Sequence, residues 1–143
     1  MSFDLKLTNG SFEFGPNGSL QCIFNEEKLK QDIIKILLTS QGGDKLHPWY
    51  GSPLGERVIG KALPFNILES EVADAVNFCL TNIMKLQKLQ LKDGQHLTPT
   101  EQLSQILNVK VQRSLYDSRQ YNIVIDVSTK KGSVIREVFD IQL

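Results

Sequence analysis

The sequence predicts an α+β fold: an N-terminal β-hairpin, two main helices with short helices beside them, and a C-terminal antiparallel sheet of about three strands. Apolar residues alternate with polar ones over residues 1–24 and again over residues 106–143, which is the period of a half-buried strand. Over residues 25–105 they recur every three or four positions, the period of an amphipathic helix. We therefore expect residues 1–143 to form one domain with a β-meander, a helical part and a β-sheet.

The composition excludes several classes of protein. The chain has 143 residues, of which 41% are hydrophobic and 22% charged, as is usual for a globular domain. No apolar run approaches the roughly 20 residues that cross a bilayer, so we expect no membrane partner. Lys plus Arg and Asp plus Glu number 16 each. Without a basic excess to neutralise phosphates, we expect no nucleic-acid partner either.

The compartment follows from the N-terminus and the cysteines. The first residues carry no signal peptide, so we expect folding in a reducing cytoplasm. Cys22 and Cys79 lie far apart in apolar patterns, which favours two buried free thiols over a metal site.

The N-terminal part reads as a meander or looped hairpin. Apolar and polar residues alternate over 3–7, and Asn9-Gly10 is a strong turn signal. A second turn is expected at 15–18, followed by a short strand at 20–24.

The helical part begins at Asn25, which is well placed to cap a helix that ends near Ser40. A short helix is expected over 54–61 and a long one over about 66–91. The tail of the long helix, 85–92, alternates and is also compatible with a strand. Thr98 and Glu101 form a capping-box pattern, which predicts one more short helix.

The last third predicts strands at 107–112, 121–128 and 133–143, the last two joined by a hairpin turn. The closing strand is apolar on both faces, with Val134 and Val138 on one side and Ile135, Phe139, Ile141 and Leu143 on the other. Such a strand is usually covered on both faces. It is therefore either a central strand or an outer strand covered by another chain.

A compact loop over 37–54 links the first two helices. Two prolines and several glycines bend it around the adjacent aromatics Trp49 and Tyr50. Two interpretations remain open: the aromatics fold back onto the core, or Pro48, Trp49, Tyr50 and Gly51 form a contact surface.

Catalytic patterns are absent from the sequence, so we expect no enzyme, cofactor or metal site. His47 and His96 belong to no nucleophile or metal-ligand motif. Glu56 and Glu101 are the most defensible carboxylate pair for glycoside hydrolysis. Each also has a simpler role, Glu56 on a solvated helix and Glu101 in its capping box.

Beyond these patterns, the order Leu37-Leu38-Thr39, Gly42, Pro48-Trp49-Tyr50-Gly51-Ser52 and Leu54 resembles a known family. That family is the inner baseplate wedge, or sheath initiator, of contractile phage tails, with relatives in type VI secretion and some members labelled lysozyme-like. The resemblance covers about residues 20–143, including the order of elements. The family often carries a Glu-Pro-Arg triplet before the C-terminal sheet. Here only Glu101 matches it, so Arg57 or Arg113 would have to replace its arginine.

The resemblance implies a structural role in the tail baseplate, after assembly in the host cytoplasm. About six copies per baseplate would join the wedge to the first sheath ring. A sheet resembling the sheath's own C-terminal domain would template sheath assembly by β-strand augmentation. Expected partners are the tail sheath protein, other baseplate wedge proteins and central hub or tube proteins. The expected contacts are Pro48, Trp49, Tyr50, Gly51, Arg57, Glu101, Tyr121, Val134, Val138, Phe139 and Ile141. The alternatives are a peptidoglycan hydrolase and a peptide-binding adaptor.

Overall fold

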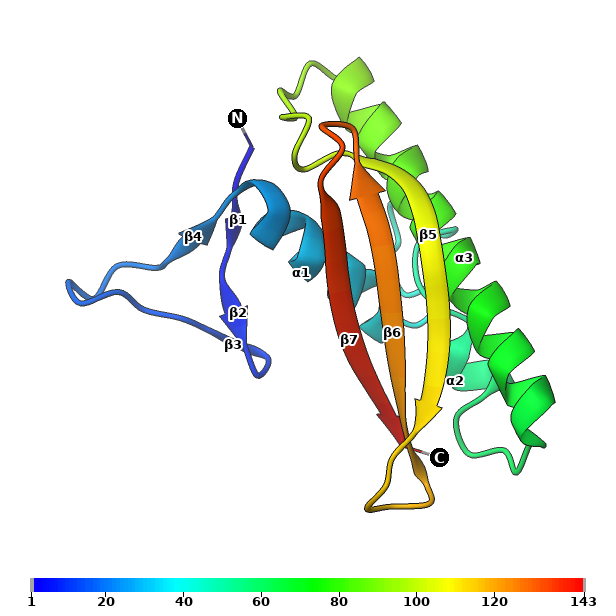
Figure 1. Cartoon of the computed structure of the whole chain (residues 1–143). Helices are drawn as coiled ribbons and strands as arrows, with labels where there is room; N and C mark the ends of the chain where they lie inside the picture. The colour runs from blue at the N-terminus through cyan, green and yellow to red at the C-terminus, as the bar shows by residue number, and fades with distance from the viewer. Residues whose placement is uncertain (1, 143) are drawn as a thin grey trace.

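A computed structural model describes residues 2–142, in which a β-structured arm, three helices and a three-stranded sheet follow one another (Figure 1). The arm, residues 2–24, contains β1 (Asp4–Leu5), β2 (Leu7–Thr8), β3 (Ser11–Phe12) and β4 (Cys22–Ile23). β1 pairs with β4 and β2 with β3, both antiparallel. The predicted looped hairpin is thus confirmed, and Figure 1 shows that it projects away from the sheet.

The helices are α1 (Asn25–Leu38), α2 (Leu54–Arg57) and α3 (Phe65–Lys92). α1 and α3 bury their apolar stripes against each other and against the sheet. The tail of α3 is helical to Lys92, which excludes the strand interpretation of 85–92. Asn25 does not cap α1. Its backbone has a φ of 52°, and its side chain accepts hydrogen bonds from Thr98 and Thr100.

The sheet contains β5 (Leu103–Arg113), β6 (Gln120–Thr129) and β7 (Val134–Gln142), in the order β5–β6–β7 and antiparallel throughout. One face lies on the helices, with α3 against β5 and α1 against β7. Along β6 every second residue, from Tyr121 to Thr129, is buried in that face. The other face has no element of the described chain packed on it (Figure 1).

One further expectation needs correction, and one alternative left open by the sequence is decided. Residues 99–102 form a turn and a bend instead of a short helix, and β5 begins directly afterwards. The capping-box contact nevertheless exists, because the Thr98 N–H donates to Glu101 Oε1 at 2.9 Å. β7 is an edge strand, so the closing strand is not central.

The cysteines differ from each other. Cys79 is fully buried, and burial raises the pKa of its thiol, whereas Cys22 in the arm is exposed, contrary to expectation. None of the helices in residues 2–142 is both long and apolar enough to span a bilayer.

Candidate functional site at the edge of the sheet

The candidate site is the outer edge of β7, where main-chain groups lack a partner strand. The Thr129 N–H donates to the Ser133 carbonyl at 2.9 Å, which sets the phase of the β6–β7 ladder. In an antiparallel ladder, alternate residues direct both backbone groups to the same neighbour. Ile135, Glu137, Phe139 and Ile141 therefore bond to β6. The N–H and C=O groups of Arg136, Val138 and Asp140 point to the free edge.

The two faces of β7 differ as the sequence predicts. Ile135 and Ile141 are buried and Phe139 packs against the core, while Val134 and Val138 on the other face are 63% and 49% exposed. A valine pair, Val124 and Val138, lies side by side across β6 and β7 on this uncovered face. An apolar strip thus runs next to the free edge.

A charged pair stiffens the same uncovered face. Arg136 donates to both carboxylate oxygens of Asp126, at 2.8 and 3.1 Å. The hydrogen bond from Arg136, with its positive charge, lowers the pKa of Asp126. Such a fork holds two side chains in one geometry, so β6 and β7 present a preformed surface.

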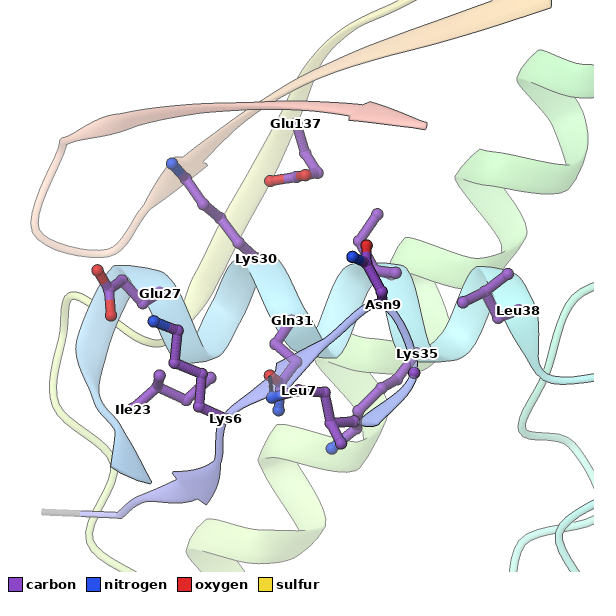
Figure 2. A pocket seen from close by; sticks show the side chains of 12 residues that line it. Lys6, Leu7, Asn9, Ile23, Glu27, Lys30, Gln31, Lys35, Leu38 and Glu137 are labelled. Atoms are coloured by element: carbon purple, nitrogen blue, oxygen red, sulfur yellow. Dashed lines mark hydrogen bonds between the residues drawn. The ribbon is translucent and has the colours of Figure 1, made fainter. Parts of the chain in front are cut away.

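A groove of about 640 Å³ lies beside this edge, between the arm, α1 and β7 (Figure 2). Leu7 and Ile23 of the arm and Leu38 of α1 contribute apolar surface. From opposite sides, Glu137 of β7 and Lys30 of α1 point into the space between the two elements. The groove therefore occupies the space between β7 and α1.

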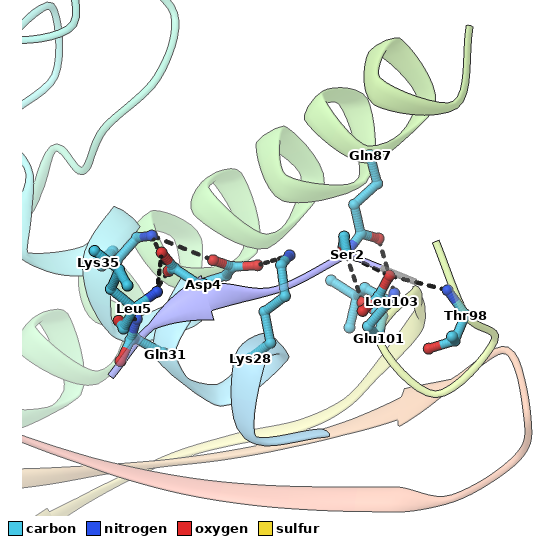
Figure 3. A network of polar contacts seen from close by, with 11 residues as sticks. Ser2, Asp4, Leu5, Lys28, Gln31, Lys35, Gln87, Thr98, Glu101 and Leu103 are labelled. Atoms are coloured by element: carbon cyan, nitrogen blue, oxygen red, sulfur yellow. Dashed lines mark hydrogen bonds and ion pairs between the residues drawn. The ribbon is translucent and has the colours of Figure 1, made fainter. Parts of the chain in front are cut away.

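The arm is held on α1 by a polar clamp (Figure 3). Asp4 accepts a charged hydrogen bond from Lys35 at 2.6 Å and another from Gln31 at 2.8 Å. Gln31 also donates to the Leu5 carbonyl and accepts from the Leu7 N–H, both at 2.9 Å. One glutamine thus fixes the backbone of the arm and thereby one side of the groove.

The aromatic loop lies elsewhere, against α2 and α3. Lys85 Nζ is 4.2 Å from the centre of the Trp49 ring, and Asn82 donates to the Trp49 carbonyl at 3.0 Å. Tyr50 packs against the core, while Pro48 is exposed. Each interpretation therefore holds for part of the loop: its aromatic residues anchor it to the rest of the chain, and Pro48 stays exposed. Arg57 in α2 is exposed as well.

Gly51 allows this loop to approach the backbone that follows α1. Its φ is 120°, and a Cβ placed on it would lie 2.6 Å from the Ser40 carbonyl oxygen. Ser40 and Ser52 form a parallel bridge at this point. Gly51 is buried, so its role is a close backbone approach and not a side-chain contact.

Besides Gly51, three predicted contact residues are buried in the chain's own core. Glu101 is fully buried: Oε1 accepts from Ser2 and Thr98, and Oε2 has no hydrogen-bond partner among the described residues. Tyr121 stacks on Phe65 with ring centres 6.4 Å apart, and Ile141 is 4% exposed. The structure corrects the expectation that these side chains face a partner, because their surface is already used in folding. The main chain of Ile141 is used as well, because it bonds to β6.

Sequence reasoning missed the residues that shape the groove. Glu137 is a charged residue on the face of β7 where the other residues are apolar. This break in the pattern was the signal by which the sequence could have marked it. Lys30 and Gln31 look like ordinary solvated residues of an amphipathic helix, so nothing in their spacing marks them. Leu115 and Tyr116, 96% and 98% exposed at the tip between β5 and β6, were also missed.

Comparisons with known proteins give a likeness of fold. A scan against protein-family models and a search of curated proteins each found no match. Among solved structures, the chain resembles a protein of Geobacter sulfurreducens described as a "putative tail lysozyme", with a TM-score of 0.59 and 17% identity. The match covers 82% of this chain and 90% of that one. At this identity the likeness shows that the two chains share an α+β fold.

Proposed function

We propose that this chain is a structural protein of a contractile-tail baseplate. It joins the wedge to the first ring of tail sheath and templates sheath assembly by strand addition. The observation that carries the proposal is the edge of β7, which pairs with no other strand of the described chain. A groove lies beside this edge. Support also comes from the fold shared with a protein described as belonging to a tail.

The β7 edge suits strand addition because its hydrogen-bonding groups are preformed. β7 is 9 residues long, so the edge offers roughly 30 Å of backbone. A neighbour's extended segment would pair with the main chain of Arg136, Val138 and Asp140, which gives affinity without requiring one sequence. Val134 and Val138 on the uncovered face would then gain the apolar neighbours that they lack.

The predicted contact residues that are exposed but lie outside β7 are assigned to other partners in this proposal. Pro48 belongs to the loop that Lys85 and Asn82 of α3 anchor, and Arg57 lies in α2, which packs on α3. We assign them to the other wedge proteins, and the β7 edge to the sheath. Near-zero net charge fits a chain that ends within an assembly, because it gives little repulsion between neighbours.

A proline at Val138 tests the edge directly. The Val138 N–H points away from β6, so Val138→Pro removes a donor that pairs with no strand of the described chain but that an added strand needs. We expect baseplates carrying this variant to lack attached, full-length sheaths in electron micrographs. Val138→Thr keeps the N–H group and a β-branched side chain, and we expect normal tails from it.

Folding is checked by melting both purified variants, which should unfold within a few degrees of each other. Normal sheaths on baseplates that carry Val138→Pro would refute the proposal. A free-standing peptide adaptor, the other binding alternative, predicts a protein that works without any tail. Sheath and tube genes next to the gene of this chain would speak against that alternative.

A peptidoglycan hydrolase is the second candidate, raised by the description of the Geobacter protein. Hydrolysis of this type needs two carboxyl groups that flank an accessible sugar bond. Glu101 is fully buried, so Glu56 and Glu101 do not form such a pair. We expect the purified chain to leave no clearing in a peptidoglycan zymogram. Clearing that disappears in Glu56→Gln would overturn this expectation.

A further inference from the structure

The groove beside β7 leaves apolar side chains uncovered. Leu7 lines it from the arm, and Ile34 and Leu38 line it from α1; Leu7 and Ile34 are half-buried, and Leu38 is 67% exposed. These residues come from elements on two sides of the groove, and Figure 2 shows β7 along the third. A segment that pairs with β7 would therefore place every second side chain toward α1. Those side chains need to be mainly apolar to cover this surface.

The β7 side of the groove carries one charged residue. Glu137 occupies an inward-facing site on β7 among Ile135, Phe139 and Ile141. Burial raises the pKa of its carboxyl group, although Lys30 and the Val138 N–H act in the opposite direction. Among the described residues no cation approaches the Glu137 carboxylate within 4.0 Å. A carboxylate in this position is incompletely neutralised.

The other charges of the groove leave a negative balance. Lys6 pairs with Glu13 at 3.1 Å, and Lys35 pairs with Asp4 and Asp32. Three charged residues of the groove, Lys30, Glu27 and Glu137, form no ion pair within 4.0 Å in the described chain. They contribute one positive and two negative charges.

We propose that this groove selects an extended segment of another protein. That segment carries apolar residues at alternate positions and a lysine or arginine on the face toward α1, beside Glu137. The inference rests on the proposed function, because it specifies the segment that the β7 edge receives. The arm of the same chain is not the occupant, since its strands pair with one another and Asp4 and Gln31 hold it on α1.

The role of Glu137 is then twofold. An inward charge on an edge strand discourages pairing with arbitrary apolar strands, since burying it unpaired is costly. The same carboxylate favours a strand that brings a cation, and it sets the register, because a shift by one residue would move the cation to the opposite face.

Two synthetic peptides test the selection. Each has the length of β7, with threonine on one face and valine on the other, and carries either lysine or glutamate at its central valine position. We titrate them into the isotope-labelled full chain and follow the amide signals of Val138 and Ile34 by NMR. The lysine peptide should bind about tenfold more tightly than the glutamate peptide, the size expected for opposite against like charges across two strands.

Variants make the comparison specific. Glu137→Lys should reverse the preference, and Glu137→Gln should bring the two affinities close together. Asp74→Lys is the matched control, because it changes the net charge equally but lies exposed on α3, outside the residues that line the groove; it should leave the preference in place.

Two outcomes overturn the inference: neither peptide binds at about 1 mM, or Glu137→Lys retains the wild-type preference. In either case, loss of sheath in Val138→Pro would still support the proposed function. A charge-selective groove combined with normal tails in Val138→Pro would refute the proposed function and leave the groove's selectivity standing.

Discussion

At the scale of single residues, burial decides which predicted contacts are available. Val134 and Val138 carry exposed side chains beside free backbone groups, whereas Glu101 and Tyr121 are used inside the fold. Glu101 shows why a motif match is not a site. Its carboxylate joins Ser2 to Thr98, and its carbonyl accepts from Gln87 at 2.8 Å. It therefore closes the turn that leads into β5.

Gly51 allows a prediction at the same scale. Gly51→Ala should destabilise the chain by about 3 kcal/mol, because the new Cβ meets the Ser40 backbone and the positive φ disfavours alanine. Urea unfolding measures the change. Gly55→Ala is the matched control: Gly55 lies in α2 with open space around it, so alanine there should be neutral or slightly stabilising.

At the scale of elements, the arm depends on a few polar contacts. β1 to β4 are each two residues long, too short to be stable by themselves. Phe12 and Phe14 of the arm are more than half exposed, so its apolar packing is limited. The clamp of Asp4, Gln31 and Lys35 on α1 therefore determines where the arm lies, and with it one side of the groove.

The clamp should respond to acid. Burial works against ionised Asp4, but the hydrogen bonds from Lys35 and Gln31 prevail and lower its pKa below that of a free aspartate. A lowered acid pKa means that the stabilisation is complete above the unfolded value and disappears as pH falls through the folded one. The arm should therefore stay in place down to the pH at which a free aspartate titrates, about 4, and loosen only as the pH falls further.

Loosening is measured by the NMR signals of the Gln31 side-chain amide and the Leu5 N–H during an acid titration. Asp4→Asn should show the loosened arm already at neutral pH and a weaker acid response. Asp74→Asn, which alters an exposed carboxylate on α3, should behave like the wild type. A wild-type arm that keeps its neutral-pH signals through the titration would contradict this account of the clamp.

At the scale of the whole molecule, the fold separates two kinds of surface. The sheet lies on the helices by one face and leaves the other face and the β7 edge uncovered, as Figure 1 shows. The aromatic loop and α2 lie on the helical side, where Trp49 is anchored by Lys85 and Asn82. Under the proposed function, this separation would let a sheath subunit and a wedge protein bind without excluding each other.

The sequence by itself determined the fold class, since hydrophobic periodicity reports whether a segment buries one side of a helix or one face of a strand. It thereby located the long helix, the three C-terminal strands and the two faces of the closing strand. It failed at residues 99–102, where a turn stabilised by the same capping contact replaces the predicted helix, and at Asn25, whose side chain binds a distant loop.

Only the tertiary structure decided that β6 is the central strand and that β5 and β7 lie at the edges, because periodicity does not state the order of strands in a sheet. It also decided that Glu101 is buried and that Glu137 faces Lys30 across a groove. These facts depend on segments far apart in the chain, the arm, α1 and β7. Their approach follows from the packing of the whole core and leaves no trace in local spacing.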